Sequence, residues 1–132
     1  MDNLIIKSYF GGQLNNSGGS VKGAALFEAL DVAALTLVNE NITQFYNQWG
    51  VVTNRAEIKY HDRVLPFSFV EIYGGIESVS GASIDMDLTM YTRVAKETEW
   101  RKSCTGVFCF SIINEQKQIV RIPRDIRDAF KR

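Results

Sequence analysis

The chain has 132 residues and a mass of 14.9 kDa, the size of one ordinary globular domain with its own core. Apolar residues make up 45% and charged residues 23%, which is typical of a soluble globular protein and not of a disordered one. Fifteen basic residues offset fifteen acidic ones, so no net positive field exists to bind a nucleic acid or an anionic membrane. No apolar run reaches the roughly 18–20 residues of a membrane helix, and the apolar stretch within residues 1–10 is too short for the hydrophobic region of a signal peptide. We therefore expect one cytoplasmic domain over residues 1–132.

The first predicted elements are a short strand, a loop and a long helix. Residues 4–9 are rich in strand formers, and residues 11–20 hold so many Gly, Asn and Ser residues that they form a loop. Ser20 is a candidate N-cap for a helix over residues 21–40. Apolar residues recur in that helix at spacings of three and four and also cover its other sides, which predicts burial nearly all round. Asp31 lies at the middle of this helix. Burial of an unpaired carboxylate costs free energy, so an acid at this position indicates either a partner or a function.

The remainder of the chain is predicted to be mostly strands. Apolar patterns indicate strands over residues 54–60, 66–73, 84–91, 107–113 and 118–122, and a short helix in the charged tail over residues 124–132. A single helix that is apolar all round needs a sheet that wraps around it. The order of the elements therefore predicts an α+β hotdog fold, an antiparallel sheet of five or six strands around one long central helix.

The cysteines and the histidine indicate no redox, metal or triad chemistry. Cys104 and Cys109 are five apart in one predicted strand, so they lie on opposite faces about 16 Å apart and cannot pair. Their spacing matches no zinc or redox motif, and we interpret both as small core residues. His61 is the single histidine, and no Ser or Cys nucleophile in a recognisable context accompanies it. We expect no metal and no cofactor.

One segment resembles a known family. It reads NxxGxxKG over residues 16–23 and, seven residues later, DxAA over residues 31–34. This pattern resembles the signature of the hotdog acyl-CoA thioesterases, the group that includes phenylacetyl-CoA and medium-chain acyl-CoA hydrolases. Three further segments are similar to the second strand, the opening of the fourth strand and the 4-hydroxybenzoyl-CoA thioesterase-like C-terminus of that superfamily: residues 52–60, 81–83 and 119–130. Lys22 and Ala24 stand where the family has a histidine and a second glycine.

The resemblance implies hydrolysis of an acyl thioester, of coenzyme A or an acyl carrier protein, by a homodimer or by a tetramer or hexamer. It implies Asp31 as the base or nucleophile and the Gly23 amide as the donor that polarises the thioester carbonyl. Asn16 would orient the water or the carbonyl. The alternatives are a solvated Asp, an Asn chosen for loop geometry and a Gly chosen for close packing. Glu28, one turn before Asp31, is the second candidate acid.

Five other residues are expected to contact the substrate: Lys22, Ala24, Thr53, Arg93 and Lys96. The last two belong to a basic cluster suited to the phosphates of coenzyme A, although a solvated charged hairpin is the alternative interpretation. The replacements at Lys22 and Ala24 favour a second function, a non-catalytic acyl-CoA-binding or scaffold protein. A dehydratase or acyltransferase of lipid or polyketide assembly is the third.

Overall fold

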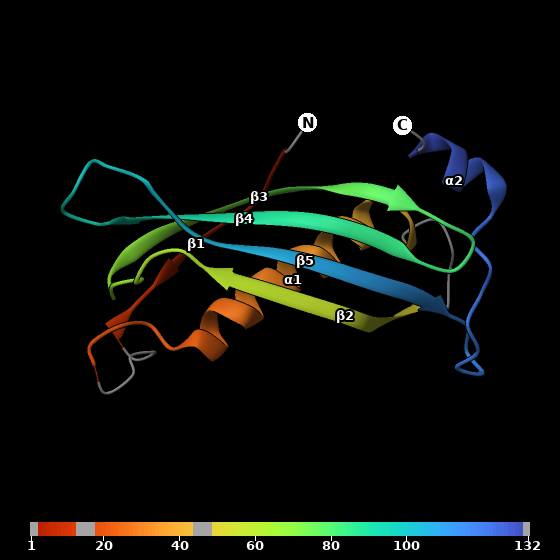
Figure 1. Cartoon of the computed structure of the whole chain (residues 1–132), viewed down its shortest axis with the longest axis horizontal. Helices are drawn as coiled ribbons and strands as arrows, with labels where there is room; N and C mark the ends of the chain where they lie inside the picture. The colour runs from red at the N-terminus through yellow and green to blue at the C-terminus, as the bar shows by residue number, and fades with distance from the viewer. Residues whose placement is uncertain (1–2, 13–17, 44–48, 131–132) are drawn as a thin grey trace.

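A computed structural model describes residues 3–12, 18–43 and 49–130 of the chain. These residues form a curved five-stranded antiparallel sheet that wraps one long helix, with a short helix near the C-terminus (Figure 1). In chain order the elements are β1 Asn3–Phe10, α1 Gly23–Asn41, β2 Gly50–Tyr60, β3 Ser68–Val79, β4 Ile84–Val94, β5 Arg101–Ile113 and α2 Arg124–Ala129. The strand order is β1-β3-β4-β5-β2, so β1 and β2 are the edge strands of this sheet. Within the described residues, no helix is long and apolar enough to cross a membrane.

One side of α1 and the inner face of the sheet form the core. The buried residues of α1 recur at helical spacing: Leu26, Leu30, Ala33, Ala34, Leu37 and Val38. They pack against inward-facing side chains that alternate along the strands, such as Ile72, Met86 and Phe108. Gly106 allows close packing, because a Cβ there would lie 2.9 Å from the ring of Phe108 and 3.4 Å from Leu30. The Leu30 side chain can therefore pack against the backbone of β5 at this position.

Most of the predicted elements are confirmed, with shifted ends: β3 continues to Val79, and β5 begins at Arg101. The predicted last strand is wrong, because residues 118–122 contribute only an isolated bridge between Ile113 and Ile119. This segment is short and the Ile119 side chain is 62% exposed, so it buries too little apolar surface to extend the sheet. The sheet therefore has five strands, within the predicted range.

Two predictions about α1 are wrong. Lys22, not Ser20, is its N-cap residue, because the Ser20 hydroxyl instead accepts a hydrogen bond from Arg63 Nε at 2.5 Å. The helix is also not buried all round, since Phe27 and Val32 are 39% and 46% exposed. The physical reason is that one layer of sheet covers one side of the helix only.

Both cysteines are free, as predicted. Cys104 points into the core, where burial raises the pKa of its thiol to about 11. Cys109 lies on the other face of β5, with its sulfur 4.0 Å from Asn54 Nδ2. The interpretation as a core residue is therefore confirmed for Cys104 and wrong for Cys109, which is half-buried on the outer face.

Candidate functional site

The N-terminus of α1 presents backbone N–H groups that the helix does not use. Its first two residues are Gly23 and Ala24, and the carbonyl of Lys22 accepts from the next two amides, Ala25 and Leu26, at 3.0 and 3.3 Å. Within the described residues, nothing accepts a hydrogen bond from the amides of Gly23 and Ala24. The first turn holds no acidic residue, so the positive end of the helix dipole is not neutralised by a side chain of that turn.

The loop that enters α1 is held by the end of β2 and by the segment after it. Arg63 donates through Nε to the Ser20 hydroxyl and through Nη2 to the Gly18 carbonyl, at 2.5 and 2.9 Å. Tyr60, the last residue of β2, donates its hydroxyl to the Gly23 carbonyl at 3.5 Å. Together these contacts fix the position of the first helical turn relative to β2.

Asp31 lies two turns further along α1 and is half-buried. Partial burial raises the pKa of its carboxyl, because removal from water disfavours the charged form. No hydrogen bond or ion pair to another described residue engages this carboxylate. The Asp31 carboxylate is therefore a stronger base than a fully solvated one.

Asp31 belongs to the flank of α1 that faces the edge strand β2. Residues four apart stack along a helix, so Asp31 follows Gly23 and Phe27 on one side. Gly23 contacts Tyr60 of β2, where a Cβ on the glycine would lie 3.5 Å from the tyrosine oxygen. The ring of Phe27 lies 6.0 Å from the ring of Phe108 on β5. The carboxylate is therefore directed toward the β5–β2 side of the sheet.

Thr53 of β2 lies on the same side of the sheet as α1. It pairs with the buried Phe110 of β5, and directly opposed residues of antiparallel strands point to the same face. Gly23 and Asp31 are eight residues apart, which places them about 12 Å from each other along the helix axis. One chain thus brings both residues to one flank but does not bring them to one reacting atom.

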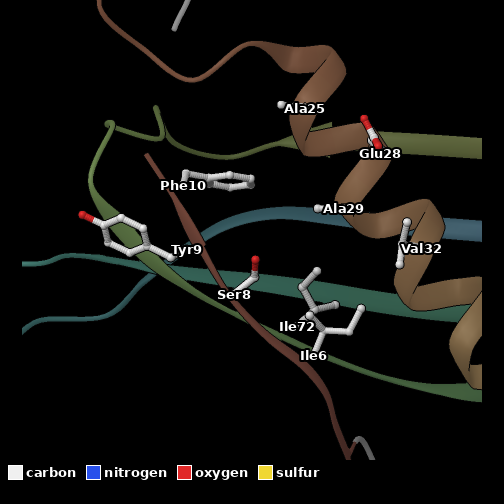
Figure 2. A pocket seen from close by; sticks show the side chains of 9 residues that line it. All are labelled: Ile6, Ser8, Tyr9, Phe10, Ala25, Glu28, Ala29, Val32 and Ile72. Atoms are coloured by element: carbon white, nitrogen blue, oxygen red, sulfur yellow. The ribbon is translucent and has the colours of Figure 1, made fainter. Parts of the chain in front are cut away.

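A cavity of about 380 Å³ lies on the opposite flank, between α1 and β1 (Figure 2). Its lining is mostly apolar and comes from both elements and from β3: Ile6, Ser8, Tyr9, Phe10, Ala25, Glu28, Ala29, Val32 and Ile72. Asp31 is two residues from Ala29, and successive helical residues turn by about 100°, so its side chain points to nearly the opposite side. The second candidate acid, Glu28, therefore lines this cavity, and Asp31 does not.

Two of the residues expected to bind substrate lie elsewhere. Arg93 is on the face of the sheet opposite α1, where its Nη1 donates to the Glu97 carbonyl at 2.7 Å. Lys96 is exposed in the connection between β4 and β5. Within one chain, neither joins Gly23 and Asp31.

The other residues singled out in the sequence are placed as follows. Lys22 and Ala24 are exposed at the start of α1, and Asn16 lies outside the described residues. His61 is exposed, and its Nε2 lies 3.0 Å from the Thr105 hydroxyl. Among the described residues, no cluster of His, Cys, Asp and Glu is suited to a metal ion.

Sequence reasoning missed Tyr60 and Arg63, which position the first turn of α1. Their contacts join residues separated by 37 to 45 positions in the chain. No local pattern marks such residues, because their role depends on which end of β2 lies next to the helix.

No protein-family model and no curated protein sequence matches the chain, but its fold occurs in solved structures. The mutant form of HI0827, a hexameric broad specificity acyl-coenzyme A thioesterase, is similar with a TM-score of 0.84 and 20% identity, over 97% of this chain and 91% of that one. Cj0915, a hexameric hotdog fold thioesterase of Campylobacter jejuni, has a TM-score of 0.84 and 14% identity, over 96% and 95%. The hexameric thioesterase y2039 from Yersinia pestis has a TM-score of 0.80 and 18% identity, over 92% and 95%.

The chain has the hotdog fold. This confirms the predicted α+β architecture, in which α1 is the central helix and the five strands wrap it. Among the described residues, β2 pairs with β5 alone, and its other edge lies beside the flank of α1 that carries Asp31.

Proposed function

We propose that this hotdog chain is a thioester hydrolase that acts on acyl-CoA. The observation that carries the proposal is Asp31, a half-buried carboxylate with a raised pKa and no partner among the described residues. The unused Gly23 amide on the same flank is the second group that thioester hydrolysis needs. The thioester as substrate class is supported by the solved structures of this fold, whose names include acyl-CoA thioesterases.

The chemistry requires a base or nucleophile and a donor for the carbonyl oxygen. As base, the Asp31 carboxylate takes a proton from the water that attacks the carbonyl carbon. As nucleophile, it attacks that carbon itself, and water then hydrolyses the resulting anhydride. In both routes the Gly23 N–H donates to the oxyanion, and the bond to sulfur breaks as the acid and the thiol are released.

The two groups are supplied by different chains in this proposal. A reacting carbonyl must lie about 3 Å from both the donor and the base, and about 12 Å of helix separates Gly23 from Asp31 within one chain. A two-fold axis beside the free edge of β2 would set the first turn of one α1 against the middle of its partner. The same contact would cover Phe27, which is 39% exposed on this flank. We therefore propose a homodimer as the functional unit, assembled further into hexamers as the names of the neighbours state for those proteins.

The remaining predicted residues take secondary roles in this arrangement. Lys22, Ala24 and Thr53 border the proposed thioester position, and Asn16 would orient the water or the carbonyl. Arg93 and Lys96 lie far from it in their own chain, so they would bind coenzyme A phosphates only through another subunit. An acyl carrier protein is the alternative carrier of the same thioester.

The test is a hydrolysis screen over acyl-CoA substrates of increasing chain length, with free thiol as the readout. We expect thiol release by the parent protein and its loss in the Asp31→Asn variant. The outcome that contradicts hydrolysis is tight acyl-CoA binding without thiol release from any substrate. That result would favour the non-catalytic acyl-CoA-binding protein, which the replacements at Lys22 and Ala24 also favour.

A further inference from the structure

The face of the sheet opposite α1 carries a row of aromatic and charged side chains. Alternation along β3 and β4 places Phe69, Glu71 and Tyr73 on this face, next to Tyr91 and Arg93. The register pairs Phe69 with Arg93 and Glu71 with Tyr91. This face lies on the other side of the sheet from Asp31, so a ligand bound here does not touch the Gly23 and Asp31 groups of the same chain.

The row already binds a cation of the chain itself. The Arg93 guanidinium carbon lies 4.9 Å from the centre of the Phe69 ring and 5.3 Å from that of Trp100. Both distances are within the range at which the electron-rich face of an aromatic ring attracts a positive charge. The ring faces of Phe69 and Trp100 thus attract a cation in this structure, and Arg93 occupies that position.

Next to this pair is a cavity of about 370 Å³, which we call the aromatic cage. It is lined by Glu71, Tyr73, Tyr91 and Trp100. The rings of Tyr73 and Tyr91 are perpendicular, at 88°, with their centres 5.7 Å apart, so they form two adjoining walls. The Glu71 side chain is 23% exposed and supplies the single carboxylate of the lining.

The polar groups of the cage select the kind of cation. Glu71 already accepts a hydrogen bond from the Tyr73 hydroxyl at 3.0 Å, and the Lys7 ammonium lies 4.0 Å from its other oxygen. A primary ammonium needs an acceptor for each of its three N–H groups, and the cage has few to offer. A quaternary ammonium needs none and gains from ring faces and from a nearby negative charge. The Lys7 side chain is 71% exposed, so its ion pair is weak and does not cancel that attraction.

We propose that the aromatic cage binds a trimethylammonium group. Three aromatic side chains and one carboxylate line an open pocket whose volume is within the range of small-ligand pockets. A free ligand such as choline and a trimethylated lysine of another protein carry the same group.

The proposal is tested by binding of choline and of its uncharged isostere 3,3-dimethylbutan-1-ol. In a Trp49→Phe background, the remaining tryptophan is Trp100, and its fluorescence reports occupancy of the cage. We expect saturable quenching by choline, with a dissociation constant on the order of 1 mM, and binding of the alcohol at least about tenfold weaker. Equal affinity for the two would overturn the proposal, because the site would then be apolar only. Absence of saturation by choline would overturn it as well.

Variants of Tyr91 test whether choline binding depends on an aromatic ring or only on the size of the side chain. Tyr91→Leu is expected to weaken choline binding by about tenfold or more, whereas Tyr91→Phe retains it. The matched control is Tyr60→Leu, an exposed tyrosine at the end of β2, which leaves choline binding unchanged. Circular dichroism checks that each variant is folded, and unchanged choline binding in folded Tyr91→Leu would refute the cage.

Free Nε-trimethyllysine and a peptide containing it, titrated in parallel with choline, distinguish a small-molecule ligand from a protein one. Thiol release should be unaffected by Tyr91→Leu, so failure of this site and failure of the proposed hydrolysis are separable.

Discussion

The two flanks of α1 differ in whether their polar groups and apolar side chains already have neighbours within one chain. The flank toward β1 encloses a cavity of about 380 Å³, with Glu28 among its lining residues. The flank toward β2 has a carboxylate and an amide with no partner among the described residues, and an exposed Phe27 beside the edge strand β2. A cavity alone therefore does not identify the reactive flank. The flank with unsatisfied chemistry is the one that a second chain would complete.

The sharpest test of the comparison exchanges the two acids for their amides. Asp31→Asn should lower kcat for acyl-CoA hydrolysis by about 10²-fold or more, since a general base is lost. Glu28→Gln is the matched control and should change kcat by less than about twofold, because Glu28 is exposed and lines the other flank. Steady-state thiol release measures both. The assignment of the flanks is reversed if the Glu28 variant is the inactive one.

The role of the Gly23 amide is tested by two substitutions at one position. Gly23→Pro removes the N–H at the first helical position, where proline is well tolerated, and should lower kcat by about 10²-fold. Gly23→Ala keeps the N–H, and its Cβ would make an ordinary 3.5 Å contact with the Tyr60 hydroxyl, so activity should be close to that of the parent. Equal loss in both variants would indicate a steric role for the glycine and no donor role.

Mixing inactive variants tests whether the two groups come from different chains. Asp31→Asn and Gly23→Pro, unfolded together and refolded in equal amounts, should form heterodimers with one intact site in two. About a quarter of the parental activity should return, because half of randomly assembled dimers are heterodimers. Each variant refolded alone is the control. No recovery in a mixture that sedimentation shows to contain dimers would place both groups in one chain.

The rate of hydrolysis should depend on pH through a single acid. The pKa of Asp31 is raised from its usual value near 3.8 by partial burial. Activity should therefore rise about tenfold per pH unit below that raised pKa and level off above it. Measurement of kcat over a series of pH values in the parent protein gives the midpoint of this rise. A midpoint at or below the ordinary value would contradict a desolvated base.

The smallest expected effect is on stability. An acid whose pKa is higher in the folded chain than in the unfolded chain costs stability when it is ionised. Asp31→Asn should therefore raise the free energy of unfolding slightly at pH 7. The gain should shrink as the pH falls through the folded pKa and vanish below the ordinary value of 3.8. Urea titrations of both proteins at several pH values measure it, and a variant less stable than the parent at pH 7 would show that the carboxylate has a favourable partner.

Local patterns predicted the elements where the physical cause is local. Ile84, Met86, Leu88 and Met90 alternate with polar residues, and all four are buried in β4 as the alternation predicts. The failed predictions have distant causes. Ser20 is not a cap because Arg63, far along the chain, engages its hydroxyl. Residues 118–122 have a strand-like composition, but they make only an isolated bridge to the sheet.

The aromatic cage also depends on contacts between residues that are distant in the chain, which local sequence patterns do not predict. Tyr73, Tyr91 and Trp100 come from β3, from β4 and from the residue before β5. Tyr73 and Tyr91 occupy positions that an isolated strand pattern assigns to a polar or solvent-facing side chain, and Trp100 lies outside the strands. Only the register between strands brings the three rings and Glu71 around one space.

The amino-acid sequence alone predicts the order of elements of the hotdog fold, and its short motif indicates Gly23 and Asp31 as candidate groups. Helical spacing, strand alternation and a short motif are properties of neighbouring residues, so they can be read without the fold. Only the tertiary structure decided that Asp31 faces β2 while Glu28 lines the cavity beside β1. Each helical residue turns by about 100°, so the flank that a side chain occupies has meaning only once the strands on either side are in place. The same packing leaves about 12 Å of helix between the two groups, and for this reason we propose that a second chain completes the site.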